Sequence, residues 1–288
     1  MALRPRRSAL YMPASNVRAL EKAKSVAADV VIMDLEDAVA PDTKATARTQ
    51  AIAAINAGGF GRREVVLRIN GLDSPWGRDD LVAAAGSKAD AILVPKVSTP
   101  SMIAEVEHGM AGAPAPMRLW AMIETPLGIL NLREIAATAS AAGSRLACFV
   151  IGTNDLVKET RAELDANRTA ALYWLSAIMT AGKAHGLDVL DGVYNDFKDL
   201  AGLLRECRQG RQLGMDGKTV IHPDQIATVN DVFRPSAEEV AAAEKIVAAF
   251  ELPENQGRGV ITMNGRMVEL LHAEMARRTL AVASAIDG

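Results

Sequence analysis

Eight short apolar runs recur along this chain, and a longer, alanine-rich segment with helical spacing follows each of them. The runs cover residues 8–12, 29–35, 64–70, 90–94, 118–124, 146–151, 187–190 and 218–221. Helical spacing is found over residues 17–28, 43–57, 77–85, 100–110, 127–142, 169–185, 196–213 and 223–232. This alternation is typical of βα units around a parallel sheet. Eight such units predict a (β/α)8 TIM barrel of the α/β class.

The barrel is expected to occupy residues 1–235, and residues 236–288 form an extension of helix, hairpin and helix. Ser236 and Glu239 give the signature of a helix start, and that helix is expected to run to about Phe250. Asn264-Gly265, a favoured pair for a tight hairpin turn, separates two short apolar runs, and a last helix should cover 270–285. An appendage this small cannot hold a core alone. We expect it to pack on its own barrel or on a neighbouring subunit.

Composition narrows the class of partner. The 288 residues carry a formal net charge of -3, and the pI is near 5.9, so the basic excess expected of a nucleic-acid or anionic-membrane surface is missing. No apolar stretch is long enough for a signal peptide or a membrane span. The two cysteines, Cys148 and Cys207, lie far apart without a Cys/His cluster. These features favour a small-molecule substrate and a cytoplasmic location.

Polar residues follow nearly every apolar run. In a barrel these positions lie on the carboxyl-terminal rim, where such enzymes build their active sites. A ring of this kind favours one site over the alternative that strand ends are simply where a chain becomes polar again. The ring consists of Glu36, Asp37, Arg68, Asn70, Lys96, Glu124, Asp155, Asp191 and His222.

Two of these acids point to a metal ion. Glu124 and Asp155 follow neighbouring strands, and two like charges at one low-dielectric site repel unless a cation lies between them. Mg²⁺ is the candidate, because it often takes only one or two protein carboxylates and keeps its other positions for water and substrate oxygens.

Several strings, in order and spacing, resemble the citrate lyase beta-subunit-like family. That family includes malyl-CoA and citramalyl-CoA lyases and belongs with the metal-dependent aldolases of the HpcH/HpaI type. The strings are RSALYMP at 7–13, DLEDAV at 34–39, LRIN at 67–70, VPKV at 94–97, MIET at 122–125, GTNDL at 152–156 and IHPDQ at 221–225.

The resemblance implies a barrel enzyme, usually trimeric, with Mg²⁺ held by Glu124 and Asp155 and with Arg68 facing the reacting oxygens of the substrate. It also implies that a CoA carrier passes Tyr11, Asn16 and Lys22, with Ile221 and His222 alongside. On the residues alone, Lys22 is equally well a solvated lysine on a helix. Glu36 and Asp37 are expected to hold metal-bound water, Lys96, or the loop with Lys44 and Arg48 in place.

The chain departs from the family pattern at two positions. Ala14 stands where the family usually has glycine, which makes that turn less open to a close ligand approach. In the tail, Met267-Val268-Glu269 replaces a Met-Ile-Asp string whose aspartate serves the site of the next subunit as acid/base. Glu269 is therefore the candidate catalytic acid/base, with one more methylene than aspartate.

The predicted function is Mg²⁺-dependent cleavage or formation of a β-hydroxyacyl-CoA thioester, such as malyl-CoA or citramalyl-CoA, with acetyl-CoA and a 2-oxo acid as the other partners. Two alternatives stay open. One is a class II aldolase acting on free, pyruvate-derived hydroxy acids without CoA, which the loss of glycine at Ala14 favours. The other is a non-catalytic, carrier-binding subunit of a lyase complex.

Overall fold

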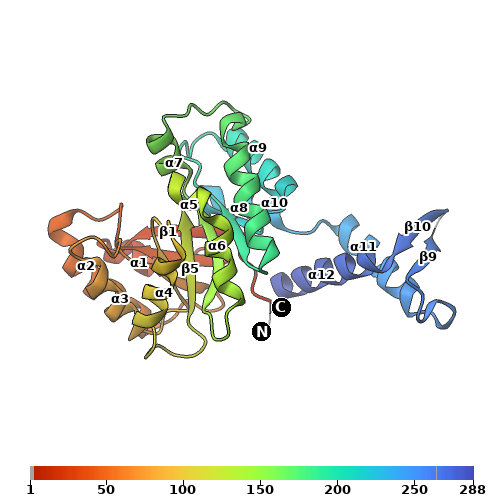
Figure 1. Cartoon of the computed structure of the whole chain (residues 1–288), viewed down its shortest axis with the longest axis horizontal. Coiled ribbons are helices and arrows are strands. Elements are labelled where there is room, and N and C mark those ends of the chain that lie inside the picture. The colour runs from red at the N-terminus through yellow and green to blue at the C-terminus, as the bar shows by residue number, and fades with distance from the viewer. Residues whose placement is uncertain (1–2, 264) are drawn as a thin grey trace. The chain divides into compact units, whose positions relative to one another are not determined.

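The eight predicted runs form the eight parallel strands of a closed barrel in the computed structural model, which describes residues 3–263 and 265–288 (Figure 1). Each strand pairs with the next along the chain, and β8 pairs with β1, so the predicted (β/α)8 fold is confirmed. The strands are β1 (Ser8–Pro13), β2 (Val30–Asp34), β3 (Glu64–Arg68), β4 (Ala91–Val94), β5 (Arg118–Ile123), β6 (Leu146–Ile151), β7 (Asp188–Asp191) and β8 (Gly217–Val220).

Helices connect successive strands. They are α1 (Val17–Lys22), α2 (Lys44–Ala57), α3 (Gly77–Ala85), α4 (Pro100–Gly109), α5 (Pro126–Leu130), α6 (Leu132–Ala137), α7 (Thr153–Thr160), α8 (Leu172–Ala184), α9 (Leu200–Leu213) and α10 (Ile226–Phe233). None of the helices within the described ranges combines the length and apolarity needed to cross a bilayer.

The helix predictions were wrong in four places. The helix predicted over 17–28 ends at Lys22, whose carbonyl accepts the Ser25 hydroxyl at 3.0 Å. The segment predicted as one helix over 127–142 breaks at Asn131, whose side-chain amide donates to the Ser98 carbonyl at 2.8 Å. The helix expected from residue 196 starts only at Leu200, where Asp199 caps it by accepting from the Gly202 N–H at 2.9 Å. Helix α7, directly after β6, was not predicted at all.

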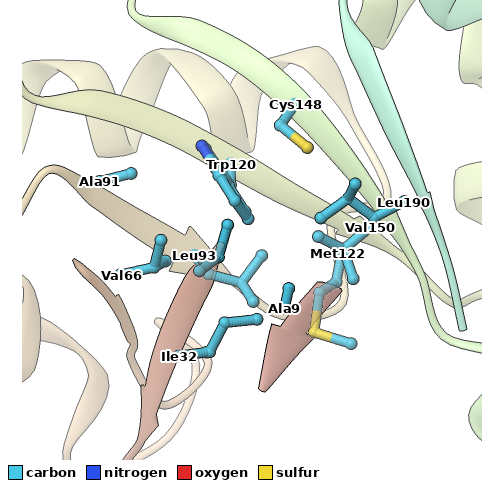
Figure 2. Close-up of a cluster of buried hydrophobic side chains, with 11 residues drawn as sticks. Ala9, Ile32, Val66, Ala91, Leu93, Trp120, Met122, Cys148, Val150 and Leu190 are labelled. Carbon is cyan, nitrogen blue, oxygen red and sulfur yellow. The ribbon is translucent and has the colours of Figure 1, made fainter. Parts of the chain in front are cut away.

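Alternation along the strands fills the barrel with apolar side chains, and in β2, β3 and β5 the inward-facing row ends in a charged one. Figure 2 shows the cluster of inward-facing residues, among them Ile32, Val66 and Met122. Two residues further along the same strand faces come Asp34, Arg68 and Glu124. The strand period therefore places these three polar side chains above the apolar core, at the carboxyl end of the barrel.

The amino-terminal end of the barrel interior is closed by Arg6. Its guanidinium lies 4.8 Å from the centre of the Trp120 ring, and it forms ion pairs of 2.7 Å with both Glu64 and Asp188. Neutralised in this way, a charged side chain can be buried beneath the core. We infer that this end of the barrel is structural.

The chain divides into two compact units: Arg6–Asn230, and Asp231–Gly288 with the N-terminal residues through Pro5. The second unit contains α11 (Ala237–Glu251), the antiparallel hairpin β9 (Val260–Met263) and β10 (Arg266–Glu269), and α12 (Leu270–Asp287). Phe250, Ile261 and Ala273 form a small buried cluster within it, so this unit has a core of its own, contrary to the expectation from its size. The predicted hairpin is present, although Asn264 of its turn lies outside the described residues. The predicted domain boundary at 235/236 stays a prediction.

Candidate active site

A cavity of about 290 Å³ opens at the carboxyl end of the barrel. Side chains from both halves of the barrel line it, so residues far apart in sequence meet there. Its lining comprises Tyr11, Asp34, Asp37, Ala38, Arg68, Met122, Glu124, Ile151, Gly152, Thr153, Asn154, Asp155, Val193, Asn195, Thr219 and Ile221. Six of the residues predicted for the site are among these: Tyr11, Asp37, Arg68, Glu124, Asp155 and Ile221.

Arg68 is held in a fixed orientation at one side of the cavity. Its Nε and Nη2 atoms each donate to one oxygen of Asp34 at 2.6 Å. Its Nη1 atom lies 2.9 Å from Glu36 Oε2 and 3.2 Å from Asp37 Oδ2. The guanidinium carbon sits 4.8 Å from the centre of the Tyr11 ring. A planar cation clamped in this way is well placed to meet the anionic oxygens of a ligand.

Asp34 was not predicted as a site residue, yet it organises this side of the cavity. Its side chain is 1% exposed, and it also accepts the backbone N–H groups of Glu36 and Ala38 at 2.8 and 3.0 Å. One carboxylate thus orients the arginine and shapes the loop after β2. The sequence contained one indication of this role. With the two-residue period of a strand, Val30, Ile32 and Asp34 fall on one face, so Asp34 is a charged residue on the inner face of an otherwise apolar run.

Glu36 does not line the cavity but links its cationic groups. It contacts Arg68 through one oxygen and the Lys96 ammonium through the other. The Lys44 ammonium is buried behind this loop and donates to the carbonyls of Leu35 and Glu36, each at 2.9 Å. Burial raises the pKa of Glu36, while Arg68 and Lys96 act in the opposite direction.

Glu124 is the most deeply buried acid of the predicted metal pair, at 1% exposure. Burial, acting together with the nearby carboxylates Glu36 and Asp155, raises its pKa to about 7. Oε1 accepts the Lys96 N–H at 2.8 Å, in a turn where Lys96 adopts the left-handed φ of 54°. A non-glycine residue in this region costs on the order of 1 kcal/mol or more, so the turn is held by its surroundings.

Asp155 reaches the cavity from helix α7, not from the end of β6. It lies in the first turn of α7, where a negative charge is stabilised by the helix dipole, and it is half-buried. Gly152, directly before the helix, is packed tightly against the Glu124 side chain. A Cβ atom at this position would lie 2.3 Å from Glu124 Oε2. The missing side chain at Gly152 is therefore what lets the two acids approach each other.

We expect Gly152→Ala to weaken Mg²⁺ binding by about tenfold or more, because the added methyl group must displace the Glu124 carboxylate or the start of α7. Isothermal titration calorimetry measures the effect. Gly112→Ala is the matched control, since nothing lies within 4 Å of a Cβ at Gly112. Equal Mg²⁺ affinity in both variants would contradict the argument.

The donor set fits a hard divalent cation. Among the described residues, none forms a hydrogen bond with Glu124 Oε2. Burial, together with the neighbouring carboxylates Glu36 and Asp155, raises the pKa of Glu124. Within the described residues, no group of three or more His, Cys, Asp and Glu side chains is arranged to hold a metal ion. Two carboxylates and an open cavity suit Mg²⁺, which retains water and substrate oxygens, better than a metal that needs a full protein cage.

Six residues of the predicted set lie outside the cavity lining: Glu36 and Lys96, described above, and four more. Asn16 caps α1 by accepting the Ala19 N–H at 3.1 Å, and Lys22 is exposed in the last turn of that helix. His222 stacks on the Phe197 ring with 4.7 Å between ring centres. The fourth, Glu269, belongs to the second unit, where it caps α12 and donates its N–H to His272 Nδ1 at 2.9 Å. Their roles toward a ligand stay predictions.

Asp191, included in the predicted ring, points into the layer between strands and helices. It is fully buried and pairs with Arg168 at 2.8 Å and with Lys218 at 3.0 Å. Although burial acts to raise the pKa of this carboxyl, the two cations hold it below its ordinary value. Asp191 is thus a structural anion, because both cations already occupy its oxygens.

Comparisons with known proteins agree with this architecture. The family model described as HpcH/HpaI aldolase/citrate lyase matches residues 7–223. The chain is 49% identical to a (3S)-malyl-CoA thioesterase of Cereibacter sphaeroides over 282 residues, covering 98% of this chain and 96% of that one. It is 35% identical to an L-malyl-CoA/beta-methylmalyl-CoA lyase of the same species over 311 residues, covering 99% and 96%.

Among solved structures, the protein CitE of Mycobacterium tuberculosis, in complex with magnesium, acetoacetate and coenzyme A, superposes with a TM-score of 0.77. The two sequences are 30% identical, and the match covers 99% of this chain and 100% of that one.

Proposed function

Because this chain belongs to the HpcH/HpaI aldolase/citrate lyase family, we propose that it is a Mg²⁺-dependent carbon–carbon lyase acting on a β-hydroxyacyl-CoA thioester. The observation that carries the proposal is the pairing, in one cavity, of a buried carboxylate of raised pKa with a clamped arginine. One half of the site can hold a cation and the other half can hold an anion. A 2-oxo acid, with a carboxylate next to a carbonyl, presents both kinds of oxygen.

Malyl-CoA and its methyl homologues are the proposed substrates. A lyase relative is named for L-malyl-CoA and beta-methylmalyl-CoA, and the CitE structure holds magnesium, acetoacetate and coenzyme A. We propose that the CoA carrier approaches along Tyr11, Asn16 and Lys22, with Ile221 and His222 alongside. The exposed Lys22 ammonium suits a phosphate group of the carrier.

In the proposed mechanism, Glu124 and Asp155 hold Mg²⁺, which as a Lewis acid lowers the pKa of the substrate hydroxyl and polarises the oxygens of the 2-oxo acid half. Arg68 stabilises the negative charge that develops on oxygen. Asp34 and Glu36 keep the guanidinium oriented throughout. As the substrate hydroxyl gives up its proton to water, the carbon–carbon bond breaks, and its electron pair leaves with the acetyl thioester as an enolate. The enolate carbon then takes a proton from a carboxylic acid, for which we propose Glu269.

We also propose that the protein is a homotrimer and that residues 236–288 dock on a neighbouring subunit. The hairpin and α12 expose Met267, Leu271 and Met275 at 67%, 49% and 63%, which a protein partner would cover. Docking of this kind would bring Glu269 to the cavity of a neighbouring subunit. A cytoplasmic location is compatible with the two free, buried cysteines.

The test is incubation of the protein with malyl-CoA and Mg²⁺, followed by separation of the products. A lyase releases acetyl-CoA and glyoxylate. The same assay on free malate and free citramalate examines the aldolase alternative. No product from any of these substrates with added Mg²⁺ would exclude both enzymes and leave a non-catalytic binding subunit.

Thioester hydrolysis is a second candidate, favoured by the 49% identity to a (3S)-malyl-CoA thioesterase. It shares the proposed substrate and differs only in the bond that breaks. A hydrolase releases malate and free CoA, which a thiol reagent detects. Malate and CoA without glyoxylate, in the assay described above, would assign this reaction in place of the lyase.

Mg²⁺ binding should strengthen as the pH rises toward 7 and level off above it. Burial and neighbouring acids raise the pKa of Glu124 to about 7, so below that pH the carboxyl must lose a proton before it can ligate a metal. We expect the affinity to fall by about tenfold for each unit of pH below 7. Calorimetric titrations between pH 5.5 and 8 measure it, and a constant affinity across that range would contradict the prediction.

A further inference from the structure

A second cavity, of about 330 Å³, lies beside the candidate active site. The two cavities share four lining residues, namely Thr153, Asn154, Val193 and Asn195. The others that line the second cavity are Leu164, Asp165, Ala166, Arg168, Tyr194, Asp196, Gly202, Arg205 and Glu206. The two spaces are therefore separated by little more than the side chains they have in common.

Asn154 and Asn195 form a reciprocal pair at this boundary. The Asn154 amide nitrogen donates to Asn195 Oδ1 at 3.2 Å, and the Asn195 amide nitrogen donates to Asn154 Oδ1 at 2.9 Å. Asn154 comes from α7, next to the metal-ligand candidate Asp155, and Asn195 comes from the loop after β7. The two hydrogen bonds therefore connect α7 to the loop after β7 at the boundary between the two cavities.

The pair is held weakly, and it occupies space. Both side chains are solvent-exposed, so the net stabilisation from their two hydrogen bonds is small. Removing one amide should therefore leave the barrel folded. It should also open a path from the space beside Asp155 into the second cavity.

Part of the second cavity can take an alkyl group, although most of its lining is polar. The lining carries three carboxylates, from Asp165, Asp196 and Glu206, and two guanidinium groups, from Arg168 and Arg205. The Arg168 guanidinium is already engaged by both oxygens of Asp191, at 2.8 and 2.9 Å. Leu164, Ala166 and Val193 add apolar surface.

We propose that the Asn154–Asn195 pair determines specificity: it limits the side chain of the 2-oxo acid half to the first cavity. The wild-type protein then prefers glyoxylate or pyruvate to longer 2-oxo acids. Opening the pair admits an unbranched alkyl side chain into the second cavity. The proposal rests on the proposed function, because it assigns the position of the 2-oxo acid.

Asn195→Ala is the test. The measured quantity is the ratio of two kcat/KM values, for condensation of acetyl-CoA with 2-oxopentanoate and with glyoxylate. We expect this ratio to be at least about tenfold higher in the variant than in the wild type, because the removal of one steric boundary is worth a factor of that size. Asn195→Asp keeps the side-chain volume and the acceptor for Asn154, so it should retain the wild-type ratio. Asn167→Ala, an exposed residue outside both linings, is the control for the substitution itself.

An unchanged ratio in Asn195→Ala, or an equal rise in Asn195→Asp, would overturn the proposal. If the wild-type protein condenses no 2-oxo acid, the proposed lyase reaction fails separately. Specificity is then read from binding: calorimetric titration of glyoxylate and 2-oxopentanoate in the presence of Mg²⁺ gives the same ratio without turnover. A ratio of binding constants that Asn195→Ala leaves unaltered would overturn the proposal in that case as well.

Discussion

Glu124→Gln should lower kcat/KM by at least about a thousandfold, corresponding to about 4 kcal/mol of lost transition-state stabilisation. The amide has the size of the carboxylate, and its oxygen can still accept the Lys96 N–H. What it lacks is negative charge, which leaves Asp155 as the remaining carboxylate of the proposed metal pair. Steady-state rates with malyl-CoA over a range of Mg²⁺ concentrations measure the loss, with the exposed Glu163→Gln as control.

The same variant should be more stable than the wild type when metal is removed at alkaline pH. An acid whose pKa is raised in the folded state destabilises that state above its ordinary pKa, and the full penalty is reached above the folded value. For Glu124 the window runs from 4.5 to about 7, so the expected gain at pH 8 is about 3 kcal/mol and vanishes below pH 4.5. Urea unfolding in EDTA at pH 5 and pH 8 checks this. A Glu124→Gln protein that is less stable at pH 8, or fully active, would contradict the metal-ligand role.

Arg68→Met should abolish activity and lower the free energy of unfolding by about 3–5 kcal/mol, because it leaves buried carboxylates without their cation. The side chains of Arg68 and Asp34 are 7% and 1% exposed, and those of Glu36 and Lys96 are 10% and 41% exposed. Of the carboxylates that contact Arg68, Glu36 thus retains a second cation, whereas Asp34 forms no other ion pair with the residues that the structure describes. Urea unfolding and the malyl-CoA assay measure the two effects.

Combining Arg68→Met with Asp34→Asn separates stability from function. The second substitution removes the uncompensated charge, so we expect it to recover part of the lost stability while activity stays absent. Arg68→Lys retains the charge but not the two-pronged contact with Asp34, and it should fall between wild type and Arg68→Met. Full activity in Arg68→Met would show that this arginine does not meet the substrate.

The barrel was predictable because its signal is local and repeated. Each of the eight strands begins and ends within two residues of its predicted run. Helix α7 escaped prediction because its eight residues follow β6 directly and carry only two buried side chains, Thr153 and Leu156. Eight residues are fewer than the roughly 11 to 18 over which helical spacing is read from a sequence. Asp155 was therefore correctly predicted at the carboxyl-terminal rim of the barrel, but it lies on α7 and not at the end of β6.

The sequence by itself determined the fold and the end of the barrel where polar chemistry collects, since the alternation of apolar and polar residues acts over a few neighbours along the chain. Only the tertiary structure decided how that chemistry is arranged: Asp34 clamps Arg68, Gly152 makes room for Glu124, and Asn154 meets Asn195. The physical reason is range. Electrostatic and steric interactions depend on distances of a few ångströms between residues. Glu124 and Gly152 lie 28 positions apart in the sequence, and Asn154 and Asn195 lie 41 apart. Only the closed barrel brings such residues together at fixed distances.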